Sequence, residues 1–294
     1  MRSLRWLLAA VLLAAACGSS VDPAYRHEIE AWKAKRLANL TKPDGWLSLF
    51  GLFWLEEGEN RVGSDPGAGV ALPASAPRDL GRLFRSGESV RWEPSLGTPV
   101  SPGSAVDLKS DAEGDPTILS TGTVSFFVIK REARIGVRVK DTDAATRRNF
   151  KGLDYFSIDR SWRFEARFEP YDPPKKVVVP TVLGTSEVDV SPGALVFSRG
   201  GKTYRLEPVF EQGSDELFLV FGDETNGKET YGGGRFVYAP MPRDGKTVLD
   251  FNKAYSPPCI FTPYATCPLP MPSNRLPIAV GAGEKTYSGA WHHP

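Results

Sequence analysis

Two carboxylates near the C-terminal end of this 294-residue chain are candidates for acid–base chemistry. Asp250 opens the string Asp-Phe-Asn-Lys-Ala-Tyr, and Glu284 lies in the string Ala-Gly-Glu-Lys. A pair of carboxyl groups can cleave a glycosidic bond without histidine, because one protonates the leaving group while the other attacks or activates water. Both are therefore candidate catalytic residues. The alternative is that they fasten irregular backbone through buried hydrogen bonds.

Further polar and aromatic side chains in the same part of the sequence are candidates for ligand binding. Their cationic members can orient a carboxylate, a phosphate or a sugar, and their tyrosine rings can stack on a sugar ring. The set is Asp223, Thr230, Tyr231, Arg235, Asn252, Lys253, Tyr255, Asn274 and Arg275. The competing interpretation of the stretch around residue 227 is a hairpin with an Asn226-Gly227 turn. No phosphate-loop pattern occurs in the sequence, so nucleotide chemistry has no support.

Histidine is missing from the body of the chain. The three histidines are His27, His292 and His293. Nucleophilic triads and dyads that use histidine as the base are therefore disfavoured, and so is a histidine-rich zinc site. The formal net charge is only +1, so no global field favours nucleic acid. We expect no metal, no cofactor and no nucleic-acid partner.

The first 17 residues have the layout of an export signal. Arg2 and Arg5 precede a short apolar run, and three alanines lead into Cys17. The run is too short for a permanent membrane span. The segment resembles a bacterial lipoprotein signal, which implies lipidation of Cys17 and anchoring in the lipid bilayer; the alternative is an ordinary secretory signal. Gly18 after the cysteine implies the outer membrane, facing the periplasm, in an organism with two membranes.

Two further cysteines lie at positions 259 and 267. Export would place them in a compartment that permits disulfides. A bridge between them would close a loop of about nine residues, and Pro263 suits the turn that this loop requires. We expect a disulfide between Cys259 and Cys267, with two free buried thiols as the alternative.

The elements that must position these residues are one helix and many short strands. Apolar residues recur at helical spacing from Tyr25 to Leu40, with Asp22 as N-cap and Pro23 at the first helical position. Short apolar runs between Gly, Pro and Asp then predict strands, and residues 131–134 suit a hairpin turn. The predicted strands are 123–129, 135–139, 162–168, 177–182, 195–197, 204–206, 217–221 and 235–238.

A proline-rich and aromatic stretch from residue 239 to 277 cannot form a regular helix or a central strand. Because its apolar content is too high for a solvated tail, we expect a coil that packs on the sheets. The many short strands favour a mainly β fold, an antiparallel sandwich or barrel-like structure with one N-terminal amphipathic helix. The predicted organisation is a signal peptide at 1–16, a lipidated tether at 17–24 and a single domain at 25–294.

Several strings together resemble a known family. GWLSL and GLFWL lie within 45–55, and a series of aspartate, threonine, glycine, tyrosine and arginine spans 223–235. DFN, AY and PPC lie within 250–259, followed by YATCPLP at 264–270, NRLP at 274–277 and AGEK at 282–285. With these motifs the chain is identified as a member of the DUF1684 family of uncharacterised bacterial proteins. The resemblance implies a family and no activity.

The function that these observations favour is an extracytoplasmic lipoprotein that binds a small polar or glycan ligand through its C-terminal half. Two alternatives stay open: a histidine-independent hydrolase that uses Asp250 and Glu284, and a structural envelope lipoprotein without a ligand. An open cleft with the two carboxylates about 5–10 Å apart would favour the hydrolase. Carboxylates buried against arginine and backbone amides would favour a structural role.

Overall fold

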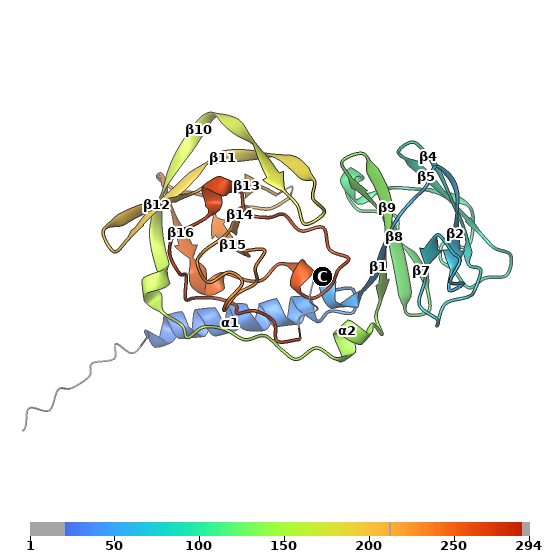
Figure 1. The fold of residues 1–294 in the computed structure, drawn as a ribbon, viewed down its shortest axis with the longest axis horizontal. Helices are drawn as coiled ribbons and strands as arrows, with labels where there is room; N and C mark the ends of the chain where they lie inside the picture. Colours follow the sequence, from blue (N-terminus) through green and yellow to red (C-terminus); the bar gives the residue numbers. More distant parts are fainter. Residues whose placement is uncertain (1–20, 212, 290–294) are drawn as a thin grey trace, which may run out of the picture.

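The computed structural model describes residues 21–211 and 213–289. The expected signal peptide at 1–16 and the expected lipidation site Cys17 lie outside these residues. The described chain forms two lobes, with a long N-terminal helix along the lower edge of Figure 1. We call residues 49–141 the N-lobe, and residues 145–289 together with this helix the C-lobe. Among the residues described, no helix has the length and apolar character needed to cross a membrane.

Helix α1 (Pro23–Leu40) begins and ends close to where the sequence predicts. The Asp22 side chain accepts a hydrogen bond from the Ala24 amide nitrogen at 3.0 Å. Pro23 occupies the first helical position, where no amide donor is needed. The helix buries one face against the C-lobe through Tyr25, Ile29 and Leu40.

The N-lobe consists of two sheets around one apolar core. Their strand orders are β1–β9–β8–β7 and β3–β2–β4–β5–β6. Trp92 and Phe126 are fully buried between the sheets and meet edge to face, with 5.8 Å between ring centroids. The strands are β1 (Leu49–Trp54), β2 (Gly58–Gly63), β3 (Val70–Ala71), β4 (Gly81–Ser86), β5 (Ser89–Pro94), β6 (Val106–Leu108), β7 (Leu119–Thr121), β8 (Val124–Arg131) and β9 (Arg134–Asp141).

The C-lobe has a second set of antiparallel strands, in the orders β12–β11–β10–β16 and β13–β14–β15. Phe251 lies at the centre of its core, with its ring centroid 5.1–6.1 Å from those of four other aromatic rings, namely Trp162, Phe164, Phe197 and Phe221. The strands are β10 (Arg163–Pro180), β11 (Ser186–Arg199), β12 (Lys202–Leu206), β13 (Val209–Phe210), β14 (Glu216–Phe221), β15 (Arg235–Pro240) and β16 (Lys246–Asp250).

The mainly β, antiparallel architecture with one long N-terminal helix confirms the predicted fold class. The predicted strands 162–168 and 177–182 belong to one strand, β10, whose pairing with β11 shifts register between Pro170 and Lys175. That irregularity interrupts the apolar alternation and explains why the sequence suggests two strands. The predicted strands include none of β1–β7, and neither β13 nor β16. In β2 and β4 the buried positions include Asn60 and Gly81 in place of apolar side chains, which weakens the apolar pattern.

From residue 251 to 277 the proline-rich segment forms a coil on the sheets of the C-lobe, as predicted, whereas residues 246–250 of the expected coil form the edge strand β16. Its backbone is tied to neighbouring strands, for example by the Tyr255 amide, which donates to the Phe236 carbonyl at 2.9 Å. Three short 3-10 turns interrupt it: η4 (Phe251–Lys253), η5 (Pro258–Ile260) and η6 (Pro272–Asn274). Elsewhere, connections contain η1 (Trp46–Ser48), η2 (Asp111–Glu113), α2 (Ala145–Arg148) and η3 (Arg160–Trp162).

The two lobes meet at three places. The β10–β11 hairpin reaches the N-lobe at its tip, where the Ser186 amide donates to Glu132 Oε1 at 3.1 Å. Beyond α1, the backbone carbonyl of Asp44 accepts from Lys140 Nζ at 2.6 Å. The C-terminal coil contributes Thr266, whose hydroxyl contacts arginines of the N-lobe. In Figure 1 the hairpin approaches the N-lobe from above, and α1 passes below.

Candidate functional site

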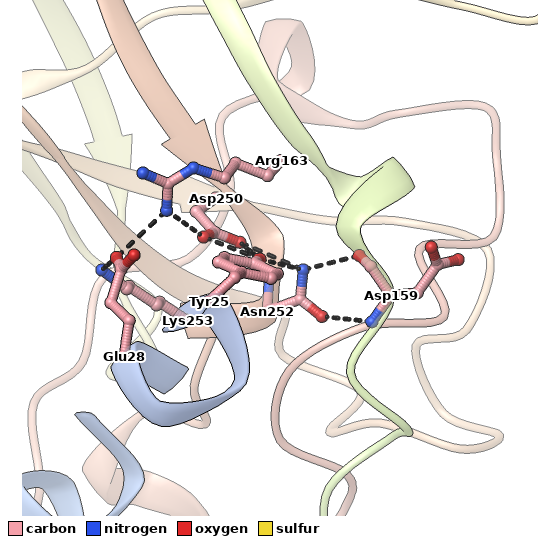
Figure 2. Close-up of polar contacts among 7 residues, drawn as sticks. All are labelled: Tyr25, Glu28, Asp159, Arg163, Asp250, Asn252 and Lys253. Carbon is pink, nitrogen blue, oxygen red and sulfur yellow. Dashed lines mark hydrogen bonds and ion pairs between the residues drawn. The ribbon is translucent and has the colours of Figure 1, made fainter. Parts of the chain in front are cut away.

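Asp250 is a buried anchor for helix α1 (Figure 2). Its Oδ2 accepts from the Tyr25 hydroxyl and from Arg163 Nη1, both at 2.9 Å. Its Oδ1 accepts from the Asn252 amide nitrogen at 3.0 Å, which caps the turn η4. Burial, and next the Asp250 charge, raise the pKa of the Tyr25 phenol, so this group stays a proton donor. The carboxylate is therefore fully occupied by protein groups.

Asn252 and Lys253 extend the same network (Figure 2). The Asn252 side chain accepts from the Asp159 amide at 2.9 Å and donates to its carbonyl at 2.8 Å, so it holds the entry to η3. Lys253 Nζ lies 2.6 Å from Glu28 Oε1 on α1, and Arg163 reaches the same oxygen at 3.0 Å. Burial opposes ionisation of Glu28, but its hydrogen bonds to Lys253 and Arg163 prevail and lower its pKa.

Glu284 is also held inside the scaffold. Its side chain is fully buried, with Oε1 accepting from Arg36 Nε of α1 at 2.9 Å and Oε2 from the Ser256 amide at 2.6 Å. The preceding Gly283 has φ +81°, and a Cβ there would lie 2.4 Å from the Ala254 carbonyl oxygen. The Ala-Gly-Glu-Lys string is thus explained by close backbone packing and by one buried ion pair.

Asp223 and Arg235 form a third buried group. Their side chains are fully buried and pair at 2.9 Å. Arg235 also donates to the Val280 carbonyl at 2.8 Å, and Asp223 Oδ1 accepts from the Val280 amide at 3.2 Å. The Thr225 and Thr230 hydroxyls lie 2.8 Å apart beside the same carboxylate. This group ties the β14–β15 hairpin to the last part of the coil.

The remaining predicted residues are dispersed. Asn274 is buried and bonds to the backbone of Glu207 and Val220, which fixes η6 on the sheet. Arg275 is exposed, and Tyr231 packs half-buried against the apolar coil. The structure therefore places the predicted set in several separate networks, most of them inside the fold. Asp250, Lys253 and Tyr255 are the members that line a cleft between the two lobes.

The expected disulfide between Cys259 and Cys267 is not formed in the structure. Both cysteines are free and buried. The Sγ atom of Cys267 accepts from the Cys259 amide nitrogen at 3.2 Å, so the η5 turn presents its backbone to the second sulfur. The thiols lie in an apolar cluster of the C-lobe. Burial, and next the neighbouring Cys259, raise the pKa of Cys267, which keeps it a neutral thiol.

A cleft with a volume of about 1460 Å³ lies between the two lobes. Helix α1, strands β8 and β9, the β10–β11 hairpin and the C-terminal coil all contribute to its walls. Tyr255 and Tyr238 stack there, with 6.3 Å between ring centroids and planes 13° apart. The Arg36 guanidinium lies 4.6 Å from the centroid of the Tyr255 ring. Further aromatic lining comes from Trp32, Trp46 and Phe127.

Charged groups of both signs line the C-lobe side of this cleft, whereas the charged groups that line its N-lobe side are cations. The C-lobe contributes carboxylates from β11 and from the start of β14, among them Glu187 and Asp189. Burial raises the pKa of both of these carboxyl groups. The N-lobe contributes the cations of β8 and β9, namely Lys130, Arg131, Arg138 and Lys140. Such a cleft suits a ligand that carries both hydroxyl and charged groups.

Arg138 is the residue that the sequence prediction missed. Strand β9 turns Ile135, Val137 and Val139 into the N-lobe core, and the alternate residues Arg138 and Lys140 face the cleft. The Arg138 side chain is buried, and burial lowers its pKa to about 10, with the charge of Arg131 acting in the same direction. The signal was present in the alternation of Arg134-Ile-Gly-Val-Arg-Val-Lys140, which places three cations, Arg134, Arg138 and Lys140, on one face of a strand.

Comparison with known proteins identifies the C-lobe. The family model described as "Protein of unknown function (DUF1684)" matches residues 148–285, which is the C-lobe without helix α1. An uncharacterized protein of Haloarcula marismortui, solved in solution by NMR, is 34% identical; the match covers 49% of this chain and 80% of that chain, with a TM-score of 0.41. No curated protein matches the chain. The buried networks around Asp223, Asp250 and Glu284 draw on motifs of the matched segment, and the chain belongs to the DUF1684 family.

Proposed function

We propose that this protein binds a small polar ligand, such as a sugar or a sugar derivative, in the cleft between the N-lobe and the C-lobe. The observation that carries the proposal is the size of this cleft together with its lining of half-buried aromatic rings and charged groups. The cleft volume of about 1460 Å³ exceeds the range of about 300–1000 Å³ that is usual for small-molecule sites, so a mono- or disaccharide occupies only part of it. Aromatic rings beside hydrogen-bonding groups suit the apolar face and the hydroxyls of a sugar.

The state of the buried carboxylates favours binding over hydrolysis. A glycosidase needs one carboxyl group that protonates a leaving group and a second that faces the anomeric carbon or a water. Asp250 accepts hydrogen bonds from Tyr25, Arg163 and Asn252, and Glu284 is fully buried against Arg36 and the Ser256 amide. Both carboxylates are thus bonded to protein groups that hold the fold together, and we assign ligand binding to the cleft beside them.

The proposed setting is the cell envelope, with the chain anchored by a lipidated Cys17. Support comes from the sequence of residues 1–17. Helix α1 begins at Pro23, so the cleft would lie near the bilayer surface. Replacing Cys17 by Ser should release the protein from membranes and abolish acyl labelling. Unchanged membrane association and labelling would contradict this part of the proposal.

Saturation-transfer NMR with a panel of neutral sugars, sugar acids and sugar phosphates tests the cleft directly. Trp46, which is 36% exposed, lines the cleft, and Trp54 is a partly buried tryptophan of the N-lobe outside it. We expect at least one member of the panel to bind, with binding weakened by Trp46→Ala and retained in Trp54→Ala. If no member binds, or if both variants behave alike, the proposed function is wrong.

A further inference from the structure

We propose that the cleft contains an oxyanion subsite, formed by Arg138, Arg131 and Thr266, that takes the phosphate or sulfate group of the ligand. The inference rests on the proposed function, because it assigns one end of the same cleft to a chemical group. It uses residues from both lobes: two arginines of the N-lobe sheet and a threonine of the C-terminal coil.

The first observation is that Arg138 is a buried cation without a carboxylate partner among the described residues. Arg138 is only 5% exposed, yet no carboxylate of the described residues lies within ion-pair distance of its guanidinium group. Its Nε has no hydrogen-bond partner, and its Nη2 donates to the Thr266 hydroxyl at 3.3 Å. Arginine is rarely buried unless it is paired, because an uncompensated charge is costly to desolvate. The Arg138 guanidinium therefore has free N–H donors that can bind the anionic group of a ligand.

The second observation is that two guanidinium groups converge on one oxygen. Arg131 Nε donates to the same Thr266 hydroxyl, at 3.1 Å. Two guanidinium groups that share one hydrogen-bond acceptor repel each other, and an anion beside them stabilises the pair. Asp111 compensates Arg131 at 2.9 Å, and it also accepts from the Lys130 amide at 3.0 Å. The Asp111 carboxylate is thereby engaged with β8, and it forms no ion pair with Arg138.

A second unbalanced cation lies two residues along the same face of β9. Lys140 forms no ion pair within the described chain, and its ammonium group donates to the Asp44 backbone carbonyl. Arg138 and Lys140 are two cations without an ion-pair contact among the described residues, and two such cations suit a dianion better than a single carboxylate. The Trp46 ring covers this end of the cleft, with its centroid 5.3 Å from the Arg138 guanidinium carbon. We infer a phosphate or sulfate ester, because a tetrahedral oxyanion accepts bonds from several arginine donors at once.

The test measures binding of inorganic phosphate, sulfate and acetate to the full chain by calorimetry, at constant ionic strength. We expect saturable 1:1 binding of phosphate and sulfate, and at least tenfold weaker binding of acetate. Arg138→Met should weaken phosphate binding at least tenfold, and Arg138→Lys should restore part of it. Arg61→Met is the matched control, because Arg61 is an exposed arginine on N-lobe strand β2, outside the cleft. It should bind phosphate as the wild type does.

Thermal unfolding separates a binding defect from a folding defect. Phosphate should raise the melting temperature of the wild type and of Arg61→Met, and leave that of Arg138→Met unchanged. A folded Arg138→Met variant that still binds phosphate like the wild type overturns the subsite. Absence of phosphate and sulfate binding in the wild type overturns it as well. If a neutral sugar binds the cleft in that case, the proposed function survives without the subsite.

A phosphate ester can be soluble or can be the headgroup of a lipid, and a vesicle assay distinguishes the two. The probes are glycerol 3-phosphate and phosphatidylcholine vesicles with or without phosphatidic acid. Arg138-dependent binding of glycerol 3-phosphate alone assigns the subsite to a soluble ester. Arg138-dependent binding of the phosphatidic acid vesicles assigns it to a headgroup. Binding of either probe that is unchanged in Arg138→Met contradicts the subsite.

Discussion

Buried charges in this chain are of two kinds. Asp223, Asp250 and Glu284 each have a cation partner and backbone donors, and together they fasten the hairpins, the coil and helix α1. Arg138 has a hydroxyl partner and faces a cleft. Breaking a buried ion pair is strongly destabilising. An unpaired buried charge lowers the stability of the fold, so its presence indicates a role other than stability. The difference separates scaffold residues from the candidate ligand-binding residue.

Arg138→Met tests this distinction through stability. Methionine fills a similar volume without a charge, so in a buffer free of phosphate and sulfate we expect the free energy of unfolding to rise by about 1–3 kcal/mol. Urea denaturation followed by tryptophan fluorescence measures the change. Arg61→Met, on the exposed side of β2, should stay within about 0.5 kcal/mol of the wild type. A clear loss of stability in Arg138→Met would show that the arginine is a scaffold residue.

Glu284→Gln tests the opposite case. The substitution leaves the Arg36 guanidinium, whose side chain is only 12% exposed, without its counter-charge. We expect the free energy of unfolding to fall by about 3 kcal/mol, as for other broken buried pairs. Glu88→Gln is the control, because Glu88 is 71% exposed and its ion pair with Lys130 contributes about 0–1 kcal/mol. A Glu284→Gln variant as stable as the control would return Glu284 to the list of catalytic candidates.

At the scale of elements, helix α1 is fastened to the C-lobe at three points along its length. Tyr25 bonds to Asp250, Glu28 pairs with Lys253 and Arg163, and Arg36 pairs with Glu284. Tyr25, Glu28 and Arg36 follow one face of the helix at intervals of three and eight residues, which suits the helical repeat. Since α1 also forms one wall of the cleft, its attachment decides the shape of the candidate site.

Acid should weaken the attachment of α1 through Glu28. Its pKa is lower in the folded state, so the pairing contributes stability above the unfolded-state value of about 4.3 and loses it as pH falls through the folded-state pKa. The Glu28 side chain is 41% exposed, so solvent screening limits the contribution to about 0.5 kcal/mol. Urea titrations between pH 6 and pH 3 should show a smaller stability loss for Glu28→Gln than for wild type. Parallel losses in the two proteins would mean that Glu28 contributes nothing.

At the scale of the whole molecule, each lobe has its own apolar core, and few side chains join them. The N-lobe core includes Trp92 and Phe126, whereas the C-lobe core centres on Phe251. The contacts between the lobes are polar, through Glu132, Asp44 and Thr266. The cleft therefore depends on two bodies that fold around separate cores and meet at its ends.

Deletion of residues 21–42 should affect the two lobes differently. The C-lobe loses Tyr25, Ile29 and Leu40 from its buried surface and leaves Asp250 and Glu284 without their partners on α1. The N-lobe keeps its core intact. Two-dimensional amide NMR should then show dispersed signals for the N-lobe and collapsed signals for the C-lobe. Dispersed signals from both lobes would mean that α1 is dispensable for folding.

The sequence alone was sufficient for the helix, for most C-lobe strands and for the family. The N-cap at Asp22, the proline at position 23 and the apolar spacing are local signals, and α1 follows them. The short apolar runs of β14 and β15 and the turn residues between them are equally local signals. The motifs of the C-terminal half also mark the residues that are buried and bonded. They fall where the backbone is irregular and needs polar partners.

Only the tertiary structure decided what those residues do. Asp250 and Glu284 look like an acid–base pair in the sequence, but their partners Tyr25 and Arg36 lie more than 200 residues away and become neighbours only when α1 packs on the coil. Arg138 lies on a strand whose alternation is ordinary. The C-lobe covers this face of the sheet and buries Arg138 beside the Thr266 hydroxyl, with no carboxylate of the described residues in ion-pair contact. That environment makes Arg138 a candidate ligand-binding residue. Burial and charge balance depend on which distant surfaces meet, and the local sequence pattern does not contain that information.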